Sequence, residues 1–483
     1  MIEQTFSLGR NPRIHIAQVQ GNVEIQSWRE HLVSVVSDGE VGVLQPEGKT
    51  LNIQQCSTNL KLQVPVHSSI LIKHVEGNVF IERVDEVHID DVSGQVNVNT
   101  VGGDAHLEHV GGAIELGTVG SDLHVEDAPA LAVHNNIGAD AIFRSVGRIA
   151  VQTVGADCAI TDAETVEVST VGNDLSARNV QATLRCGVVG NECSLQGCTQ
   201  AEITLGNIGS DIHVSSAASL QAGTIGSDCS VLDIAGDVTL GQIGSDLHIQ
   251  GIGGNLRIGS VGGDARLQGI QGAVDARTVG GDLDMQSTFS ENSRTHMNVG
   301  GDARLHLPDD VNLSIRALVG GDVRGEAITF GHGGHILQII YGDGNAHLDL
   351  KVGGDLTLHG NNIPSNVSGI NRDFMSGFSQ EMGSFGRDMG KFGRDMGRLG
   401  QELAEALNPI NWSQDVEAEK YRRKAEKQAR KSEKYGPRVR VRVNEREWQF
   451  DPDRVERLKD QARQAAAEGV YGALEAVERA MHN

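Results

Sequence analysis

A short motif recurs along this chain at nearly constant spacing, and it constrains the fold more than any other feature. The motif reads Val or Ile, then Gly, then Gly, Ser, Ala or Asn, then usually Asp, followed by an apolar residue. It begins first at Val101 and last at Val352, and most copies are 17 to 19 residues apart. Weaker copies lie halfway between, as at Val110 and Ile252. Because such a period is the signature of stacked repeats, we expect coils of about 18 residues, each made of two nine-residue halves.

The residues after each glycine pair alternate between apolar and polar. Leu123 and Val125 are two apart, so they face one side of a short strand while His124 faces the other. The glycines permit a tight turn and the close approach of stacked backbones. A single coil cannot bury its apolar side, so neighbouring coils must stack. The sequence therefore predicts a mainly β protein with a parallel β-solenoid over residues 91–362.

Composition agrees with a narrow core of stacked coils. Aromatic residues make up only 4% of the chain, and the 61 Gly are accompanied by only 9 Pro, which excludes a collagen-like or Pro-rich disordered chain. The six Cys show no metal-binding spacing such as C-x-x-C. Cys158, Cys193 and Cys229 occupy the inward slot that Leu123 fills in its own copy. We interpret them as small, buried apolar side chains.

A column of aspartates follows from the repeat, because each copy places its Asp at the same turn. Stacked carboxylates repel one another unless something compensates. Asp commonly accepts backbone N–H bonds in its own turn, and we favour this role. The alternative is a ladder of bound cations, which requires several oxygen ligands at each site. The column consists of Asp104, Asp122, Asp140, Asp157, Asp174, Asp211, Asp228, Asp246, Asp264 and Asp282.

Four histidines occupy the outward slot of the repeat and raise the question of a zinc site. His106 and His124 belong to successive copies of the motif, whereas His213 and His248 lie farther along. We interpret all four as solvent-facing, on the ground that no acidic or Cys partner recurs beside them. The motifs G-x-S-x-G, H-E-x-x-H and G-x-x-x-x-G-K are absent from the sequence. We therefore expect a non-enzymatic protein without cofactor, metal or catalytic residues.

The repeat changes towards both of its ends. Residues 1–90 contain further strand patterns, and we expect a β-rich cap there, because terminal repeats must cover an exposed core. Beyond Asp282, the spacing grows to 20 residues at Asp302 and Asp322 and to 33 at Asp355. We expect the coils of this part to be enlarged or to carry loops.

Particular stretches of the chain resemble a known family. The phrases GNVEIQSW and LKLQVPVHSSILIKHVEGNVFIERV, together with the VGGDL series, are similar to a bacterial adhesin-type β-solenoid family of unknown function. The likeness covers about residues 15–360. A looser resemblance, through coil length, links the chain to bactofilins, which are cytoskeletal solenoids that polymerise end to end. The resemblance implies a solenoid fold, and the adhesin type implies export.

A different pattern begins after an expected linker at residues 363–371. The heptads MGSFGRD, MGKFGRD and MGRLGQE predict an amphipathic helix over residues 372–407. Its two Gly per heptad cost about 2 kcal/mol relative to Ala, so this helix needs a partner. Balanced Arg and Asp on its polar side favour a protein partner over a membrane surface. The apolar stripe consists of Met375, Phe378, Met382, Phe385, Met389, Phe392, Met396, Leu399 and Leu403.

Residues 408–483 predict a small interaction module. Glu417–Lys434 reads as a charged helix, and Arg438–Val443 alternates Arg and Val as a strand does, with Glu447–Phe450 as its hairpin mate. A terminal helix with an apolar stripe begins after Asp451. We expect this module to oligomerise.

The charge of the chain bears on its partners. The formal net charge is −23, and the acidic excess lies within residues 1–370, which therefore repel nucleic acid and anionic lipid. The first residues lack the apolar core of a secretory signal, and no apolar run reaches membrane-spanning length. We expect a cytoplasmic location, with contact at the membrane periphery as the alternative.

These features together predict a non-catalytic cytoplasmic scaffold or self-assembling structural protein. We expect self-association or a protein partner through the C-terminal helices, and we do not expect nucleic acid as a partner. Two alternatives stay open: a cell-surface, adhesin-like binding protein, and a membrane-surface organiser that acts through residues 372–407.

Overall fold

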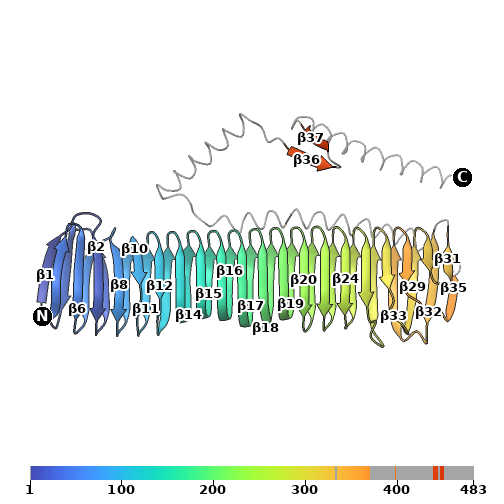
Figure 1. Cartoon of the computed structure of the whole chain (residues 1–483), viewed down its shortest axis with the longest axis horizontal. Coiled ribbons are helices and arrows are strands. Elements are labelled where there is room, and N and C mark those ends of the chain that lie inside the picture. Colours follow the sequence, from blue (N-terminus) through green and yellow to red (C-terminus); the bar gives the residue numbers. More distant parts are fainter. Residues whose placement is uncertain (1, 332–333, 370–397, 399–438, 444–445, 451–483) are drawn as a thin grey trace. The chain divides into compact units, whose positions relative to one another are not determined.

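The computed structural model describes residues 2–331, 334–369, 398, 439–443 and 446–450. The described part of the chain up to residue 369 forms one elongated stack of hydrogen-bonded strands (Figure 1). Most of the strands pair in parallel at intervals of 17 to 19 residues, as the repeat predicts. The expected parallel β-solenoid is therefore confirmed.

Each coil contributes one strand to each of two faces. On face A, the strands that follow the motif Asp pair with one another, as β22 pairs with β20 and β24. On face B, β11 pairs in the same way with β9 and β13. The two nine-residue halves of a coil are thus two strands joined by two turns. The regular coils are built from β8 (Ser69–Val75), β9 (Val79–Val84), β10 (Glu86–Ile89), β11 (Val96–Val101), β12 (Ala105–Glu108), β13 (Ala113–Val119), β20 (Cys229–Ile234), β21 (Val238–Ile243), β22 (Leu247–Ile252), β23 (Leu256–Val261), β24 (Ala265–Ile270), β25 (Val274–Val279) and β26 (Leu283–Ser287), with six longer strands between β13 and β20.

The six longer strands run from face A to face B without a break. A residue with positive φ lies at the corner between the two faces, five residues beyond the motif Asp. Examples are Asp127, with a φ of 56°, and Asn179, with a φ of 55°. Asp, Asn and Gly tolerate this left-handed conformation better than other residues do. The sequence interpretation above missed this column. It comprises His109, Asp127, Ser145, Asp162, Asn179, Gly197, Ser216, Asp233, Gly251 and Gly269. The long strands are β14 (Leu123–Ile137), β15 (Ala141–Val154), β16 (Cys158–Val171), β17 (Leu175–Val189), β18 (Cys193–Ile208) and β19 (Ile212–Ile225).

The core is one continuous cluster of inward side chains that come from both faces. Leu123 and Val125 are buried, as their alternation predicts, and Cys158 is buried with a free thiol. Burial raises the pKa of that thiol, so it behaves as an apolar group. The coils approach closely at the motif turn, where a Cβ on Gly120 would lie 2.0 Å from the carbonyl oxygen of Gly102. Only glycine fits there.

At the N-terminal end, the order of the coils in space differs from their order in the sequence. The coil formed by β2 and β3 lies between the coil of β6 and β7 and that of β8 and β9, with parallel pairing on both sides. Antiparallel strands cover the outermost coil: β4 pairs with β7, β5 pairs with β6, and β1 pairs with β4. Parallel pairing therefore begins upstream of residue 91. These strands are β1 (Ile2–Ser7), β2 (Arg13–Val19), β3 (Val23–Trp28), β4 (Leu32–Ser37), β5 (Val41–Glu47), β6 (Thr50–Cys56) and β7 (Leu60–Pro65).

The C-terminal end shows the same kind of inserted coil. The coil of β33 and β34 lies between that of β27 and β28 and that of β29 and β30. Of the two expected explanations for the long spacing before Asp355, an enlarged coil or a coil that carries loops, the enlarged coil is wrong. The chain forms the outermost coil first, returns through antiparallel β31 and β32, and then forms the coil beneath it. Strand β35 pairs antiparallel with β32. The strands are β27 (Arg294–Val299), β28 (Ala303–His306), β29 (Leu313–Val319), β30 (Val323–Gly325), β31 (Ile328–Phe330), β32 (His335–Tyr341), β33 (Ala346–Val352), β34 (Leu356–His359) and β35 (Asn366–Gly369).

A separate compact unit spans Asn411–Asn483. Within it, β36 (Val439–Val443) pairs antiparallel with β37 (Arg446–Phe450). Nearly all of the expected heptad helix, including its nine stripe residues, lies outside the described residues, and so do the charged helix and the terminal helix. Within the described part of the chain, no helix has the length and apolar character needed to cross a membrane.

Candidate functional site

The outward side of face A carries one column of side chains that passes through every regular coil. The strand register aligns His88, His106 and His124 at its N-terminal part, and it aligns His213 and His248 farther along. From β10 to β28 this outward column consists of His88, His106, His124, Ile142, Ala159, Ser176, Ser194, His213, Ser230, His248, Arg266, Asp284 and Arg304.

Three successive imidazoles stack at the start of this column. The ring centroids of His88 and His106 are 4.7 Å apart, and those of His106 and His124 are 4.5 Å apart with planes only 4° from parallel. His88 belongs to a coil whose turn is a degenerate copy of the motif, which is why the repeat alone did not place it beside the other two. We call these three histidines, together with Asp90, Glu108, His109, Glu126 and Asp127, the histidine cluster.

Carboxylates accompany the histidines, contrary to the sequence-based expectation. His106 donates a hydrogen bond through Nε2 to Glu108, and Nε2 of His124 lies 3.5 Å from a carboxylate oxygen of Glu126. Each Glu stands two residues after its His, and residues two apart on a strand face the same side. The expectation that no acidic partner recurs beside these histidines is therefore wrong. The alternation of side chains along each strand already predicts that a Glu two residues after a His lies on the same side.

His109 extends the cluster around the corner of the coil. Its Nδ1 lies 3.5 Å from Asp90 Oδ1, and its Nε2 lies 3.8 Å from Asp127 Oδ2. The positive φ of 50° at His109 turns the chain at this point and brings its ring beside the carboxylates of neighbouring coils. Glu108 therefore has imidazoles on two sides, with the pair His106 and His124 on face A and His109 at the corner.

The electrostatics of the cluster follow from these contacts. The hydrogen bond from His106 lowers the pKa of Glu108, because it stabilises the carboxylate. Burial lowers the pKa of His88, and the neighbouring imidazole of His106 lowers it further. The side chains of His106, Glu108 and His124 are 35%, 30% and 20% exposed. Each offers one donor atom, and these atoms all lie within 4.8 Å of one another, so the three groups can hold a metal ion.

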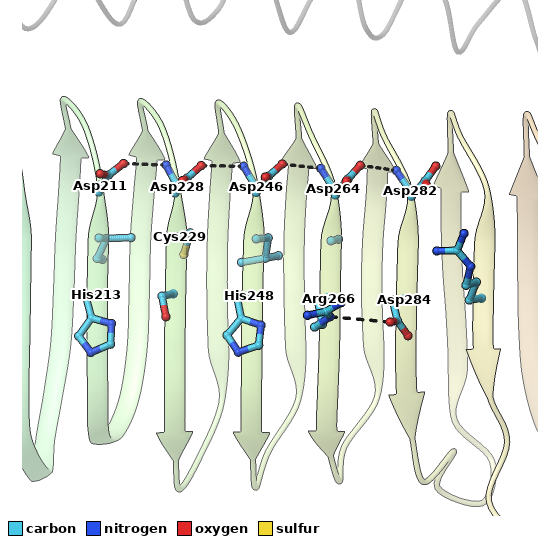
Figure 2. Close-up of a pocket in the computed structure, with 15 residues that line it drawn as sticks. Asp211, His213, Asp228, Cys229, Asp246, His248, Asp264, Arg266, Asp282 and Asp284 are labelled. Carbon is cyan, nitrogen blue, oxygen red and sulfur yellow. Dashed lines mark hydrogen bonds and ion pairs between the residues drawn. The ribbon is translucent and has the colours of Figure 1, made fainter. Parts of the chain in front are cut away.

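A second region of interest is a hollow of about 540 Å³ in the C-terminal half of face A, which we call the acidic groove (Figure 2). It lies along the motif aspartates from Asp211 to Asp282 and along the outward column from His213 to Arg304. Figure 2 shows His213 and His248 on strands separated by the strand of Cys229, so their rings do not stack. Nearby, Arg266 Nε lies 3.7 Å from Asp284 Oδ2.

The motif aspartates link coils and not the residues of their own turns. In the groove, Oδ1 of Asp246 accepts the backbone N–H of Asp264 at 2.8 Å, and Oδ1 of Asp264 accepts that of Asp282 at 2.7 Å (Figure 2). Each of the ten predicted aspartates accepts such a bond from the next coil. The expected acceptor role is thus observed, whereas its placement within one turn is wrong. A donated N–H at every step offsets the repulsion between stacked carboxylates.

Asparagine has the same role at the opposite turn of the coil. Asn22 Oδ1 accepts the backbone N–H of Asn78 at 2.8 Å, and Asn255 Oδ1 accepts that of Ala273 at 3.0 Å. A neutral amide can therefore replace the carboxylate in this bond. We therefore interpret the ladder of side-chain acceptors as a feature that stabilises the stacking of the coils.

Comparisons with known proteins identify no relative: no family model, no curated protein and no solved structure matches this chain.

Proposed function

We propose that this protein is a non-catalytic scaffold in which the solenoid is a rigid rod. Residues 372–483, which we call the C-terminal segment, bind partners or a second copy of the chain. The main support for this proposal is the unbroken ladder of parallel strands, which joins the coil of β6 and β7 at one end to the coil of β29 and β30 at the other. The buried residues form one continuous cluster along this ladder. In such a stack each coil is held by its two neighbours, which favours a rod of constant length.

The two ends of the rod bear on how the scaffold assembles. End-to-end growth by stacking requires an open coil whose parallel strands lack a partner. Here antiparallel β4 and β5 cover the first coil, and antiparallel β31 and β32 cover the last. Pro46 in β5 cannot donate a hydrogen bond to an added strand. We therefore assign self-association to the C-terminal segment instead of the coil ends.

Light scattering coupled to size exclusion tests this assignment. We expect the full chain to have a mass above its 51.5 kDa monomer. Replacing Phe378, Phe385 and Phe392 with Ser in one variant should return the mass to that of the monomer. The matched control replaces Arg387 and Arg394, on the polar side of the same heptads, with Gln and should leave the assembly intact. A wild-type protein that is monomeric at high concentration and retains no partner would refute the proposal.

The same triple Ser variant separates the scaffold from the membrane-surface alternative. Flotation with vesicles of zwitterionic and anionic lipid should leave both wild type and variant at the bottom of the gradient. Flotation of the wild type alone would move the function to a membrane surface. Cell fractionation that finds the protein outside the cytosol would favour the adhesin-like alternative.

A further inference from the structure

We propose that His106, Glu108 and His124 form a binding site for a divalent transition metal ion of the zinc type. The proposal is independent of the scaffold function, because the site lies on the solenoid and involves no residue of the C-terminal segment. It rests on the register of two neighbouring strands and on the position of one carboxylate.

The register supplies the two nitrogen ligands. β12 and β14 pair in parallel so that His106 stands directly beside His124 on the outward side of face A. Glu108 follows two residues later on β12 and lies on the same side. Three donors thus come from two adjacent strands of a rigid ladder, which is the kind of support that a metal site requires.

The distances are within reach of coordination. The three donor atoms already lie within 4.8 Å of one another. Tetrahedral zinc with bonds of about 2.0–2.1 Å holds its ligand atoms about 3.4 Å apart, so the donors need to close by about 1.4 Å at most. The imidazoles are now nearly parallel, and rotation of the rings about their side-chain bonds directs their lone pairs at a common point. The ion then replaces the proton that His106 and Glu108 share.

The side chains around the three proposed ligands favour a bound cation. Glu126 lies beside Nε2 of His124, and this second carboxylate adds negative charge next to the site. His88 stacks on the other side of His106 and limits how far that ring can turn away. Three protein ligands leave the fourth position to water.

The donor set selects the class of metal. Two imidazole nitrogens and one carboxylate oxygen suit Zn²⁺, Ni²⁺ or Cu²⁺. Ca²⁺ needs six to eight oxygen ligands and Mg²⁺ an octahedron of oxygens, which this cluster does not supply.

The outward column also contains matched controls. His213 and His248 stand in the same slot of the same face as His106. However, Ser215 and Gln250 occupy the position that corresponds to Glu108, and neither histidine has a second histidine on the next coil. They offer single imidazoles on the same scaffold.

Calorimetric titration of the full chain with Zn²⁺ tests the site. We expect the tightest binding event in the wild type to be weakened at least tenfold in His106→Gln, His124→Gln and Glu108→Gln. His248→Gln should leave that event unchanged. Titration with Co²⁺ gives a second readout, because tetrahedral Co²⁺ with these ligands absorbs strongly in the visible range and hexa-aquo Co²⁺ does not. Circular dichroism melts check that every variant is folded.

Three results would overturn the proposal. The first is a wild type whose Zn²⁺ affinity equals that of the three ligand variants. The second is a loss in His248→Gln as large as that in His106→Gln, which would mean scattered surface binding. The third is a loss in His109→Gln without a loss in His124→Gln, which would place the ion at the corner with Asp90 and Glu108 instead.

Discussion

The histidine cluster and the acidic groove each include part of the same outward column of face A, yet they offer different chemistry. In the cluster, three successive coils each contribute an imidazole, and each imidazole has a carboxylate two residues farther on, at Asp90, Glu108 and Glu126. In the groove, Ser230 separates His213 from His248, and the following positions hold Arg266 and Asp284. The parallel pairing of the strands is the same in both regions.

The outward residues of each coil therefore decide the chemistry of this surface. Strands on one face are about 4.8 Å apart, so side chains on adjacent coils touch while those two coils apart do not. A histidine in every coil builds a stack, whereas the same residue in every second coil gives isolated rings. The solenoid therefore sets the positions, and the outward residues can vary without changing the fold.

The turn glycines are common to both regions, and changing one gives the largest expected effect. Gly120→Ala would place a methyl group 2.0 Å from the carbonyl oxygen of Gly102, and backbone cannot move aside cheaply. We expect a loss of about 3 kcal/mol of stability, measured as a lower melting temperature. Gly42→Ala is the control, because its nearest neighbouring atom is 3.6 Å away. Equal melting of the two variants would contradict this account of the turn.

Moving the three ligands of the cluster into the groove tests whether these residues are sufficient for metal binding. The double substitution Ser215→Glu and Ser230→His reproduces beside His213 the arrangement of His106, Glu108 and His124. We expect one additional Zn²⁺ per chain in calorimetric titration. Ser230→His alone lacks the carboxylate and should bind at least tenfold more weakly than the double variant. Unchanged stoichiometry in the double variant would mean that register and residue type are not sufficient.

The aspartate ladder distinguishes a hydrogen-bonding role from a charge role. Asp246→Ala removes the acceptor for the N–H of Asp264, and we expect a loss of about 1 kcal/mol. Asp246→Asn keeps an acceptor, as Asn255 does at the opposite turn, and should stay within about 0.5 kcal/mol of the wild type. Thermal melts at low and high salt measure both. If Asn is as harmful as Ala, the carboxylate charge matters and a bound cation regains support.

The smallest expected effect concerns protons in the histidine cluster. His106→Gln removes a neighbouring charge that lowers the pKa of His88, so that pKa should rise towards its usual value of 6.5. His124→Gln should leave it unchanged. The folded state holds the proton of His88 less tightly than the unfolded state does. His88 therefore lowers the stability of the protein as the pH falls through about 6.5, and the variant should reduce this loss of stability. NMR titration of the imidazole signals measures the pKa directly.

Much of this structure could be predicted from the repeat. The spacing of the motif predicted the parallel coils, and the alternation around His124 predicted which side chains are buried. The acceptor role of the aspartates was also predicted. Their partners were not, because the N–H that each one accepts belongs to a residue about 18 positions away on the next coil. Local turn preferences carry no information about such a contact.

The histidine cluster was missed for two different reasons. Glu108 and Glu126 could have been found, since residues two apart on a strand share a side. His88 could not be placed by the motif, because its coil begins at Asp85 and not at a Gly-Gly-Asp turn. Only the pairing of β10 with β12 brings its ring onto that of His106.

The period, the two-strand coil and the inward apolar side chains follow from the sequence alone, because each of these depends on residues close together in the chain. The order of the coils at the two ends depends on tertiary strand pairing. Near-identical repeats can pair with any neighbour, so periodicity does not say which coil lies next to which. At both ends, antiparallel strands reverse the chain, and one coil stacks between two coils that are farther away in sequence than one repeat. The stacking that the repeat makes possible therefore also positions the coils at both ends of the solenoid.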